Sequence, residues 1–130
     1  VYYIQYAHAR VNRMVDVRAP EKNIAFDRTQ LAHYDVSILV SNTETELLAK
    51  LAAYPEIVTR AANSYEPHQI GNYLKELAAL FHGWYAQDDV KILDEQNIAL
   101  SQARLVLSLN VQQVLKNGLT LLGVSAPESM

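Results

Sequence analysis

Apolar side chains recur every three or four residues through most of this 130-residue chain. That spacing follows the 3.6-residue turn of an α-helix, so the apolar side chains share one face. A chain of this length can bury one hydrophobic core, and the pattern predicts an all-α protein, a helical bundle of about five helices. Trp84 belongs to the clearest stripe and is expected in the core, whereas spacing does not assign Tyr73 or Tyr85. That stripe consists of Ile70, Leu74, Leu77, Phe81 and Trp84.

The expected helices and breaks divide a single domain into four segments. Ala19–Pro20 is expected to end the first helix, because the residue before a proline disfavours helical dihedral angles. No glycine-rich or low-complexity linker splits the chain. Because the sequence opens with valine inside a helical pattern, we expect a fragment of a longer protein. The four segments are a first helix over 1–18, an irregular segment over 19–42, a helical bundle over 43–123 and a C-terminal tail over 124–130.

Capping residues and prolines place the helices of the bundle. Thr43–Glu46 has the spacing of a capping box, which predicts a helix start. Pro55 and Pro67 are expected at the first positions of two further helices, where a missing N–H has no cost. A long helix is expected from about Asn97.

Shorter stretches carry more specific expectations. Residues 36–40 form an apolar run that is too brief to assign to helix or strand. Asp88 and Asp89 are expected to begin a polar loop. Gly118 lies inside a helical pattern, where glycine costs about 1 kcal/mol, so we expect a close approach of two helices there. Gly123 is expected to cap the end of the long helix.

Basic side chains are concentrated near the N-terminus. Residues 1–28 carry five basic and three acidic side chains, a net charge of +2, whereas the remaining residues carry six and eleven, a net charge of −5. A phosphate-facing surface would therefore lie near the N-terminal segment, although charge alone favours an ordinary solvated face. The sequence has no cysteine, no signal-peptide pattern and no apolar run near the ~20 residues that cross a bilayer, which predicts a cytoplasmic location.

No arrangement of residues indicates catalysis. His8, His33, His68 and His82 lack the i, i+4 spacing that places two imidazoles on one helical face for a metal. His8 lies on an apolar stripe and is expected to be a packed, hydrogen-bonded core residue. A glycine-rich phosphate loop and a nucleophile elbow are both missing from the sequence. We therefore expect no catalytic residue, cofactor or metal ligand in this fragment.

A binding surface is better supported. Tyr3, Tyr6, Arg10 and Arg13 fall within a sector of about 80° on one helix at 100° per residue. Unpaired RNA bases stack on tyrosine rings while arginine engages phosphates or base edges, so this face could bind RNA. The alternative is that the tyrosines pack against a neighbouring domain, and spacing alone favours that interpretation.

Several separated motifs, in order, carry a family resemblance. The chain resembles nearly end to end the C-terminal anticodon-binding domain, of the DALR type, of bacterial arginyl-tRNA synthetases. Matching stretches are Val1–Arg10, Tyr54–Glu56, Glu66–His68, Gln112–Gly118 and the ending Lys116–Met130.

The resemblance implies a role for particular residues. In that family the Tyr-x-x-Tyr-Ala-His-x-Arg helix contributes to the surface that contacts the anticodon loop, and the C-terminal methionine reaches the same surface. The implied tRNA anticodon-binding residues are therefore Tyr3, Tyr6, Arg10 and Met130, with Arg13 as a further candidate.

The resemblance also implies the whole protein's activity and partners. Such an enzyme is an arginine–tRNA ligase that uses ATP and magnesium to charge tRNA specific for arginine. Its catalytic domain would belong to the same polypeptide, because the His-Ile-Gly-His-like and Lys-Met-Ser-Lys-like signatures are not in these residues. The implied role of this part is recognition of the anticodon, whose central base is C for every arginine codon.

Two positions depart from the family pattern. Ser129 replaces the arginine of the usual Pro-Glu-Arg-Met ending, which puts a phosphate contact from that position in doubt. Gln102–Leu105 stands where the Asp-Ala-Leu-Arg string is found. The alternatives are a related anticodon-binding domain of another synthetase and a helical protein-interaction module.

Overall fold

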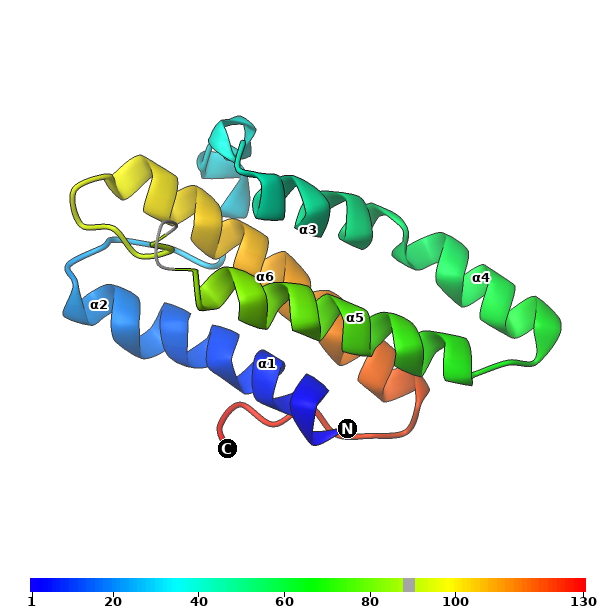
Figure 1. The fold of residues 1–130 in the computed structure, drawn as a ribbon. Helices are drawn as coiled ribbons and strands as arrows, with labels where there is room; N and C mark the ends of the chain where they lie inside the picture. Colours follow the sequence, from blue (N-terminus) through cyan, green and yellow to red (C-terminus); the bar gives the residue numbers. More distant parts are fainter. Residues whose placement is uncertain (88–90) are drawn as a thin grey trace.

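The computed structural model describes residues 1–87 and 91–130, and every regular element in that part of the chain is helical (Figure 1). The expected all-α bundle is confirmed. Five helical rods form it, because α1, η1 and α2 are continuous. The elements are α1 (Tyr2–Arg13), the π-helical turn η1 (Met14–Arg18), α2 (Ala19–Glu21), the 3₁₀ turns η2 (Leu31–His33) and η3 (Val36–Ile38), α3 (Asn42–Ala52), α4 (Tyr54–Ser64), α5 (His68–Tyr85) and α6 (Ile98–Leu121).

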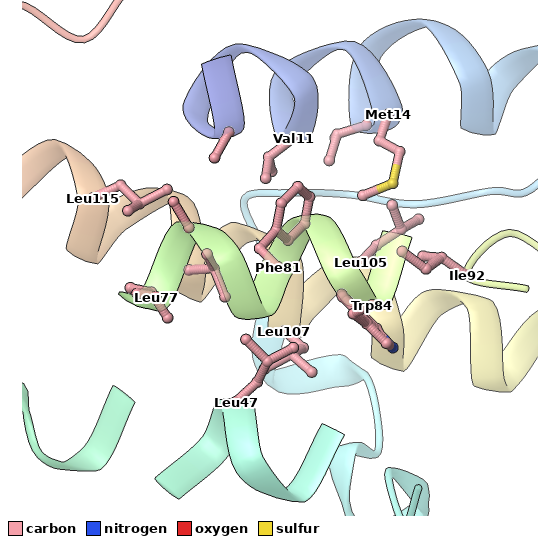
Figure 2. Packing of buried hydrophobic residues seen from close by; sticks show 14 of the residues in the cluster. Val11, Met14, Leu47, Leu77, Phe81, Trp84, Ile92, Leu105, Leu107 and Leu115 are labelled. Atoms are coloured by element: carbon pink, nitrogen blue, oxygen red, sulfur yellow. The ribbon is translucent and has the colours of Figure 1, made fainter. Parts of the chain in front are cut away.

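Helix α5 lies at the centre of the bundle and contacts α1, α3, α4 and α6. Its predicted apolar stripe is buried throughout, and Leu77, Phe81 and Trp84 have no exposed surface. Figure 2 shows Phe81 pointing toward Val11 on α1. Burial of each large apolar side chain is worth about 1.5–3 kcal/mol, so this stripe contributes much of the stability. No helix within the described residues is long and apolar enough to span a membrane.

The first helix does not end at Ala19–Pro20 as predicted but continues through α2 to Glu21. Proline lacks an N–H and its ring crowds the carbonyl four residues before it. The backbone accommodates this with the wider π-helical turn η1, in which the Ala19 N–H bonds to the carbonyl of Met14, five residues back. The helical segment thus runs to Glu21 instead of residue 18.

The capping box of α3 begins two residues earlier than predicted. Ser41 is the N-cap and accepts a hydrogen bond from the Glu44 N–H, while the Glu44 carboxylate accepts from the Ser41 N–H. The predicted cap, Thr43, instead accepts a hydrogen bond from the Gln87 side chain. Ser41 to Glu44 and Thr43 to Glu46 both have the residue types and spacing of a capping pattern. The hydrogen bonds that Glu44 accepts from Trp84 and Arg104 hold it in place and favour the first of the two.

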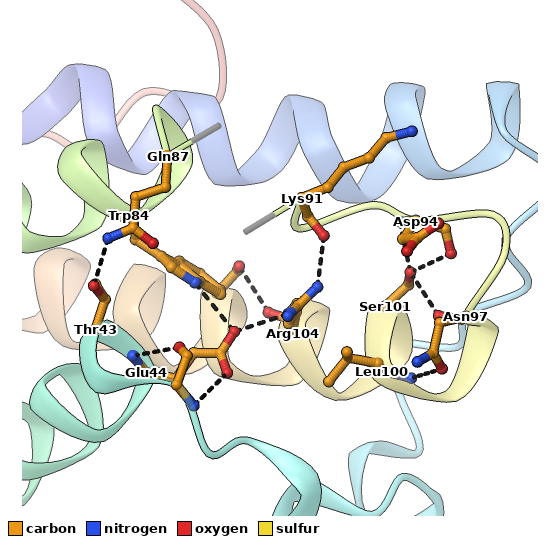
Figure 3. A network of polar contacts seen from close by, with 12 residues as sticks. Thr43, Glu44, Trp84, Gln87, Lys91, Asp94, Asn97, Leu100, Ser101 and Arg104 are labelled. Carbon is orange, nitrogen blue, oxygen red and sulfur yellow. Dashed lines mark hydrogen bonds and ion pairs between the residues drawn. The ribbon is translucent and has the colours of Figure 1, made fainter. Parts of the chain in front are cut away.

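Glu44 belongs to a buried ion-pair network, which we define as Glu44, Trp84 and Arg104 (Figure 3). The Glu44 carboxylate accepts from Trp84 Nε1 at 3.2 Å and from Arg104 Nε at 2.8 Å. Glu44 is 1% exposed and Arg104 8% exposed. Arg104 Nη1 also donates to the main-chain carbonyl of Lys91. The network therefore ties α3, α5, α6 and the segment before α6 together.

The two prolines mark the predicted helix starts to within one residue. Pro55 is at the start of α4, and Pro67 is the N-cap residue immediately before α5. The run 36–40, left unassigned by spacing, contains the 3₁₀ turn η3, followed by the buried Leu39. Asp88 and Asp89 lie outside the described residues.

Both glycine predictions for α6 are confirmed. A Cβ on Gly118 would lie 2.6 Å from the methyl carbons of Leu74 on α5, so the two helices touch at this point. Gly123 has φ +73°, and the Gly123 and Val124 N–H groups bond to the carbonyls of Thr120 and Leu119. This Schellman motif ends α6 and directs the C-terminal tail, residues 124–130, back along α1 (Figure 1).

Candidate nucleic-acid interface

A cleft of about 330 Å³ lies between α1–η1 and the end of the C-terminal tail. Tyr6, Arg10 and Arg13 contribute from α1, Tyr85 contributes from the end of α5, and Met130 contributes from the tail. Tyr6 is 47% exposed and Met130 60% exposed. Helical spacing places Tyr6, Arg10 and Arg13 on one face of α1, and the Schellman turn at Gly123 directs the tail to that face.

Arg10 is held between two tyrosine rings in this cleft. Its Cζ lies 5.0 Å from the ring centre of Tyr6 and 4.2 Å from that of Tyr85. Its Nη1 donates to His82 Nδ1 at 3.0 Å. Contact with two rings and an imidazole restricts the guanidinium to one orientation, which leaves less conformational entropy to lose on binding.

His82 joins the two helices that form this face. Because an arginine can only donate, His82 Nδ1 must be the acceptor, and Nε2–H then points to the Tyr3 carbonyl at 3.4 Å. The imidazole also packs against the rings of Tyr3 and Tyr6, at centroid distances of 4.8 and 5.9 Å. Burial, and to a smaller extent the nearby Arg10 charge, lowers the pKa of His82 below its ordinary value. We call Tyr3, Tyr6, Arg10, His82 and Tyr85 the aromatic–arginine cluster.

The tail is attached to α1 through side chains of the helix. Gln5 Nε2 donates to the Ser125 carbonyl at 2.8 Å, and His8 Nδ1 bonds to the Pro127 carbonyl at 2.9 Å. His8 is 4% exposed, which confirms the packed, hydrogen-bonded histidine that the sequence predicted. Burial lowers the pKa of His8, so the ring is neutral near pH 7.

The cleft carries both signs of charge. Arg10, Arg13 and Arg18 line it together with Asp16 and Glu128. Asp16 Oδ1 forms an ion pair at 2.9 Å with Nη2 of Arg28, which does not line the cleft. Cationic groups thus outnumber acidic ones at the lining, as the charge of residues 1–28 indicated, and such groups position phosphates.

The structure brings together most, but not all, of the residues suggested by sequence. Tyr6, Arg10, Arg13 and Met130 line the cleft, whereas Tyr3 lies one turn earlier on α1, with its ring against His82. Whether these five residues bind RNA stays a prediction.

Of the cluster, His82 was missed from sequence and Tyr85 was left unassigned. Both stand beside the buried stripe of α5, and only the contact between α5 and α1 brings Tyr85 to the cleft and His82 to Arg10. The unassigned Tyr73 is instead a core residue whose hydroxyl donates to the Lys50 carbonyl, and burial raises its pKa to about 12.

Within the described residues, no three histidine or acidic side chains come close enough to bind a metal ion. His33 and His68 are exposed, and neither residue lines the cleft. What the cleft offers is stacking surface, cationic hydrogen-bond donors and a flexible thioether.

Comparisons with known proteins identify the family and the fold. Residues 4–130 match the DALR anticodon binding domain family. The arginine–tRNA ligase of Acinetobacter baylyi is 63% identical over 130 residues, which are 100% of this chain and 21% of that protein. The arginine–tRNA ligase of Psychrobacter cryohalolentis is 49% identical over 140 residues and is covered to 22%. The solved arginyl-tRNA synthetase of Thermus thermophilus superposes with a TM-score of 0.79 at 31% identity, over 98% of this chain and 21% of that one.

The fold and the matched family define an all-α anticodon-binding domain. The chain belongs to the DALR anticodon binding domain family. It is similar along its whole length to one part of the arginine–tRNA ligases named above, and it spans about a fifth of the length of those relatives.

Proposed function

We propose that this domain recognises the anticodon loop of tRNA specific for arginine, as part of an arginine–tRNA ligase. The observation that carries the proposal is the cleft, in which Tyr6, Arg10 and Met130 from opposite ends of the chain meet. The whole-length similarity to arginine–tRNA ligases supports the choice of amino acid. The anticodon-contacting residues proposed here are Tyr3, Tyr6, Arg10, Met130 and, at the open side, Arg13.

The cluster offers the interactions that unpaired bases use. A base extruded from the loop can stack on the exposed faces of Tyr6 or Tyr85, each stack being worth about 1–3 kcal/mol in comparable RNA complexes. The unbranched, polarizable side chain of Met130 can lie against the same base. Arg13 is exposed at the edge of the cleft and suits a phosphate contact.

Arg10 is the residue we assign to the central anticodon base. All arginine anticodons carry C at that position, and cytosine presents the acceptors O2 and N3 on its Watson–Crick edge. Arg10 keeps several N–H donors beyond the one given to His82, and its orientation is fixed by Tyr6 and Tyr85. A fixed fork of donors discriminates between base edges better than a mobile charge does.

The rest of the reaction would belong to the remainder of the polypeptide. Relatives are about five times as long as the matched region, and a catalytic domain that uses ATP and magnesium would occupy the other part. This domain would hold the tRNA while the acceptor end reaches that active site. We place the protein in the cytoplasm, where tRNA is charged.

A tRNA titration tests the proposal. The intact protein should bind arginine tRNA more tightly than the same tRNA with the central anticodon C replaced, at one fixed salt concentration. Equal binding of both tRNAs would contradict anticodon recognition. Salt-insensitive binding of a protein ligand, with no tRNA binding, would instead establish an interaction module, and preference for another tRNA would indicate a different synthetase.

A further inference from the structure

The C-terminal tail reaches the cleft without regular secondary structure, and its attachment is unusual. After the Schellman turn, Val124 and Ala126 pack against the hydrophobic core. The residues between and after them, Ser125 and Pro127, accept hydrogen bonds from α1 through their main-chain carbonyls. Met130 follows three residues after Pro127. Such a tail would normally fray.

Two side chains of α1 hold those carbonyls. Gln5 is 8% exposed and His8 4% exposed, although both are polar. Burying a polar group is costly unless it is hydrogen-bonded. Gln5 Nε2 donates to the Ser125 carbonyl at 2.8 Å, and His8 donates to the Pro127 carbonyl at 2.9 Å. A carbonyl can only accept, so His8 must carry its proton on Nδ1.

The point of attachment is itself held in place. Gln112 on α6 donates through Nε2 to the main-chain carbonyl of His8 at 3.1 Å. Helix α6 therefore holds α1 at His8, just where α1 holds the tail. The charged groups that act on the His8 ring are Lys116 and Glu128, which have opposite effects on its charge. A protonated ring would keep the Nδ1–H donor, so the attachment does not depend on charge.

We propose that Gln5 and His8 are positioning residues for anticodon recognition: they fix the C-terminal tail on α1 and thereby place Met130 in the cleft. Neither residue lines the cleft, so each acts through the tail alone. Both bonds are to main-chain carbonyls, so the path of the tail does not depend on the side chain at position 129, where this chain has serine in place of the family's arginine. The recognition role rests on the proposed function, whereas the placement of the tail does not.

The test uses a double-mutant cycle in the intact protein. His8→Leu removes the donor, His8→Asn retains a donor near the position of Nδ1, and each is combined with deletion of Glu128–Met130. We expect His8→Leu to weaken arginine tRNA binding by roughly tenfold, the size of one lost stacking contact. His8→Asn should bind nearly as the wild type does. After the deletion, His8→Leu should cause no further loss.

A second readout needs no RNA. Release of the C-terminal tail by limited proteolysis should be several times faster in His8→Leu and in Gln5→Met than in wild type, and close to wild type in His8→Asn. Unchanged release, or a loss of affinity that adds to that of the deletion, would overturn the positioning role. If His8→Leu fails to fold, Gln5→Met carries the same comparison. Faster release with no tRNA binding by wild type would refute the proposed function and leave the attachment of the tail established.

Discussion

The buried ion-pair network and the aromatic–arginine cluster both combine an arginine with aromatic side chains, yet they differ in how much of the arginine and its partners remains available to a ligand. In the network, Arg104 and Trp84 both donate to Glu44, and Arg104 also donates to Lys91. In the cluster, Arg10 gives one bond to His82, and Tyr6 remains 47% exposed.

This difference separates stability from recognition. Within the described residues, no buried side-chain nitrogen or oxygen lacks a partner, so the network is closed to any further ligand. The cluster instead holds a cation in a fixed orientation at the mouth of a cleft. Changes in the network should therefore reduce the free energy of unfolding, whereas changes in the cluster should reduce tRNA affinity.

The largest effect is expected for Arg104→Met. The Glu44 carboxylate, 1% exposed, would be left buried without its cation, which typically costs about 3–5 kcal/mol. Denaturant unfolding measures this. The exposed pair Arg60–Glu56 provides the control, because Arg60→Met should change the unfolding free energy by about 0.5 kcal/mol or less. An equally small change in the free energy of unfolding for Arg104→Met would show that the network contributes little to stability.

Leu77→Ala should come next, with a loss of about 2–5 kcal/mol through the cavity it leaves at the centre of α5. Leu48, which is 39% exposed on α3, is the matched control, and Leu48→Ala should cost much less. Under conditions where the variant is folded, its tRNA affinity should be unchanged. A selective loss of tRNA affinity in Leu77→Ala would blur the distinction between core and recognition face.

Tyr6→Ala should show the opposite behaviour. We expect a loss of about 1–3 kcal/mol in tRNA binding, from stacking that exists only in the complex, and little change in thermal stability. Tyr2, 78% exposed and absent from the cleft lining, is the control on the same helix. If Tyr6→Ala instead unfolds the domain without a selective effect on tRNA, Tyr6 is a packing residue.

The smallest effect is a dependence of stability on pH. The pKa of His82 is lowered in the folded state, whereas the unfolded chain titrates near 6.5. As pH falls below 6.5, the unfolded state takes up a proton at His82 before the folded state does, which favours unfolding. The contribution of neutral His82 to the free energy of unfolding is therefore complete above pH 6.5 and is lost as pH falls through the folded-state pKa. His82→Asn should flatten the decline of unfolding free energy between pH 7 and pH 5. An unchanged decline would show that His82 is not protected from protonation.

Local sequence signals predicted most of the fold, because they act over a few residues. The stripe of α5, the helix starts near Pro67 and Asn97 and the cap at Gly123 all depend on neighbours within one or two turns. One error is local: a π-helical turn lets the first helix continue through Pro20. The other arose where a contact distant in sequence decides between two local patterns, because Trp84 and Arg104 fix Glu44 as part of the cap.

The cleft was predicted only in part for the same reason. Tyr6 and Arg10 share a face of α1 by helical spacing, and the family resemblance added Met130. His82 and Tyr85 come from α5, which is more than 70 residues further along the chain, and no short pattern relates them to α1. The bond from His8 to the tail spans 119 residues and was equally invisible to spacing.

The central claim is that Met130, carried by the tail, reads the anticodon beside Tyr6 and Arg10. Deletion of Ser129 and Met130 tests it most directly, with affinity measured for arginine tRNA and for the same tRNA with its central anticodon base replaced. The account predicts weaker binding of arginine tRNA, little effect on the altered tRNA and an unchanged melting temperature, because the tail end is exposed. Equal losses for the two tRNAs would contradict it and remove Met130 from the recognition site.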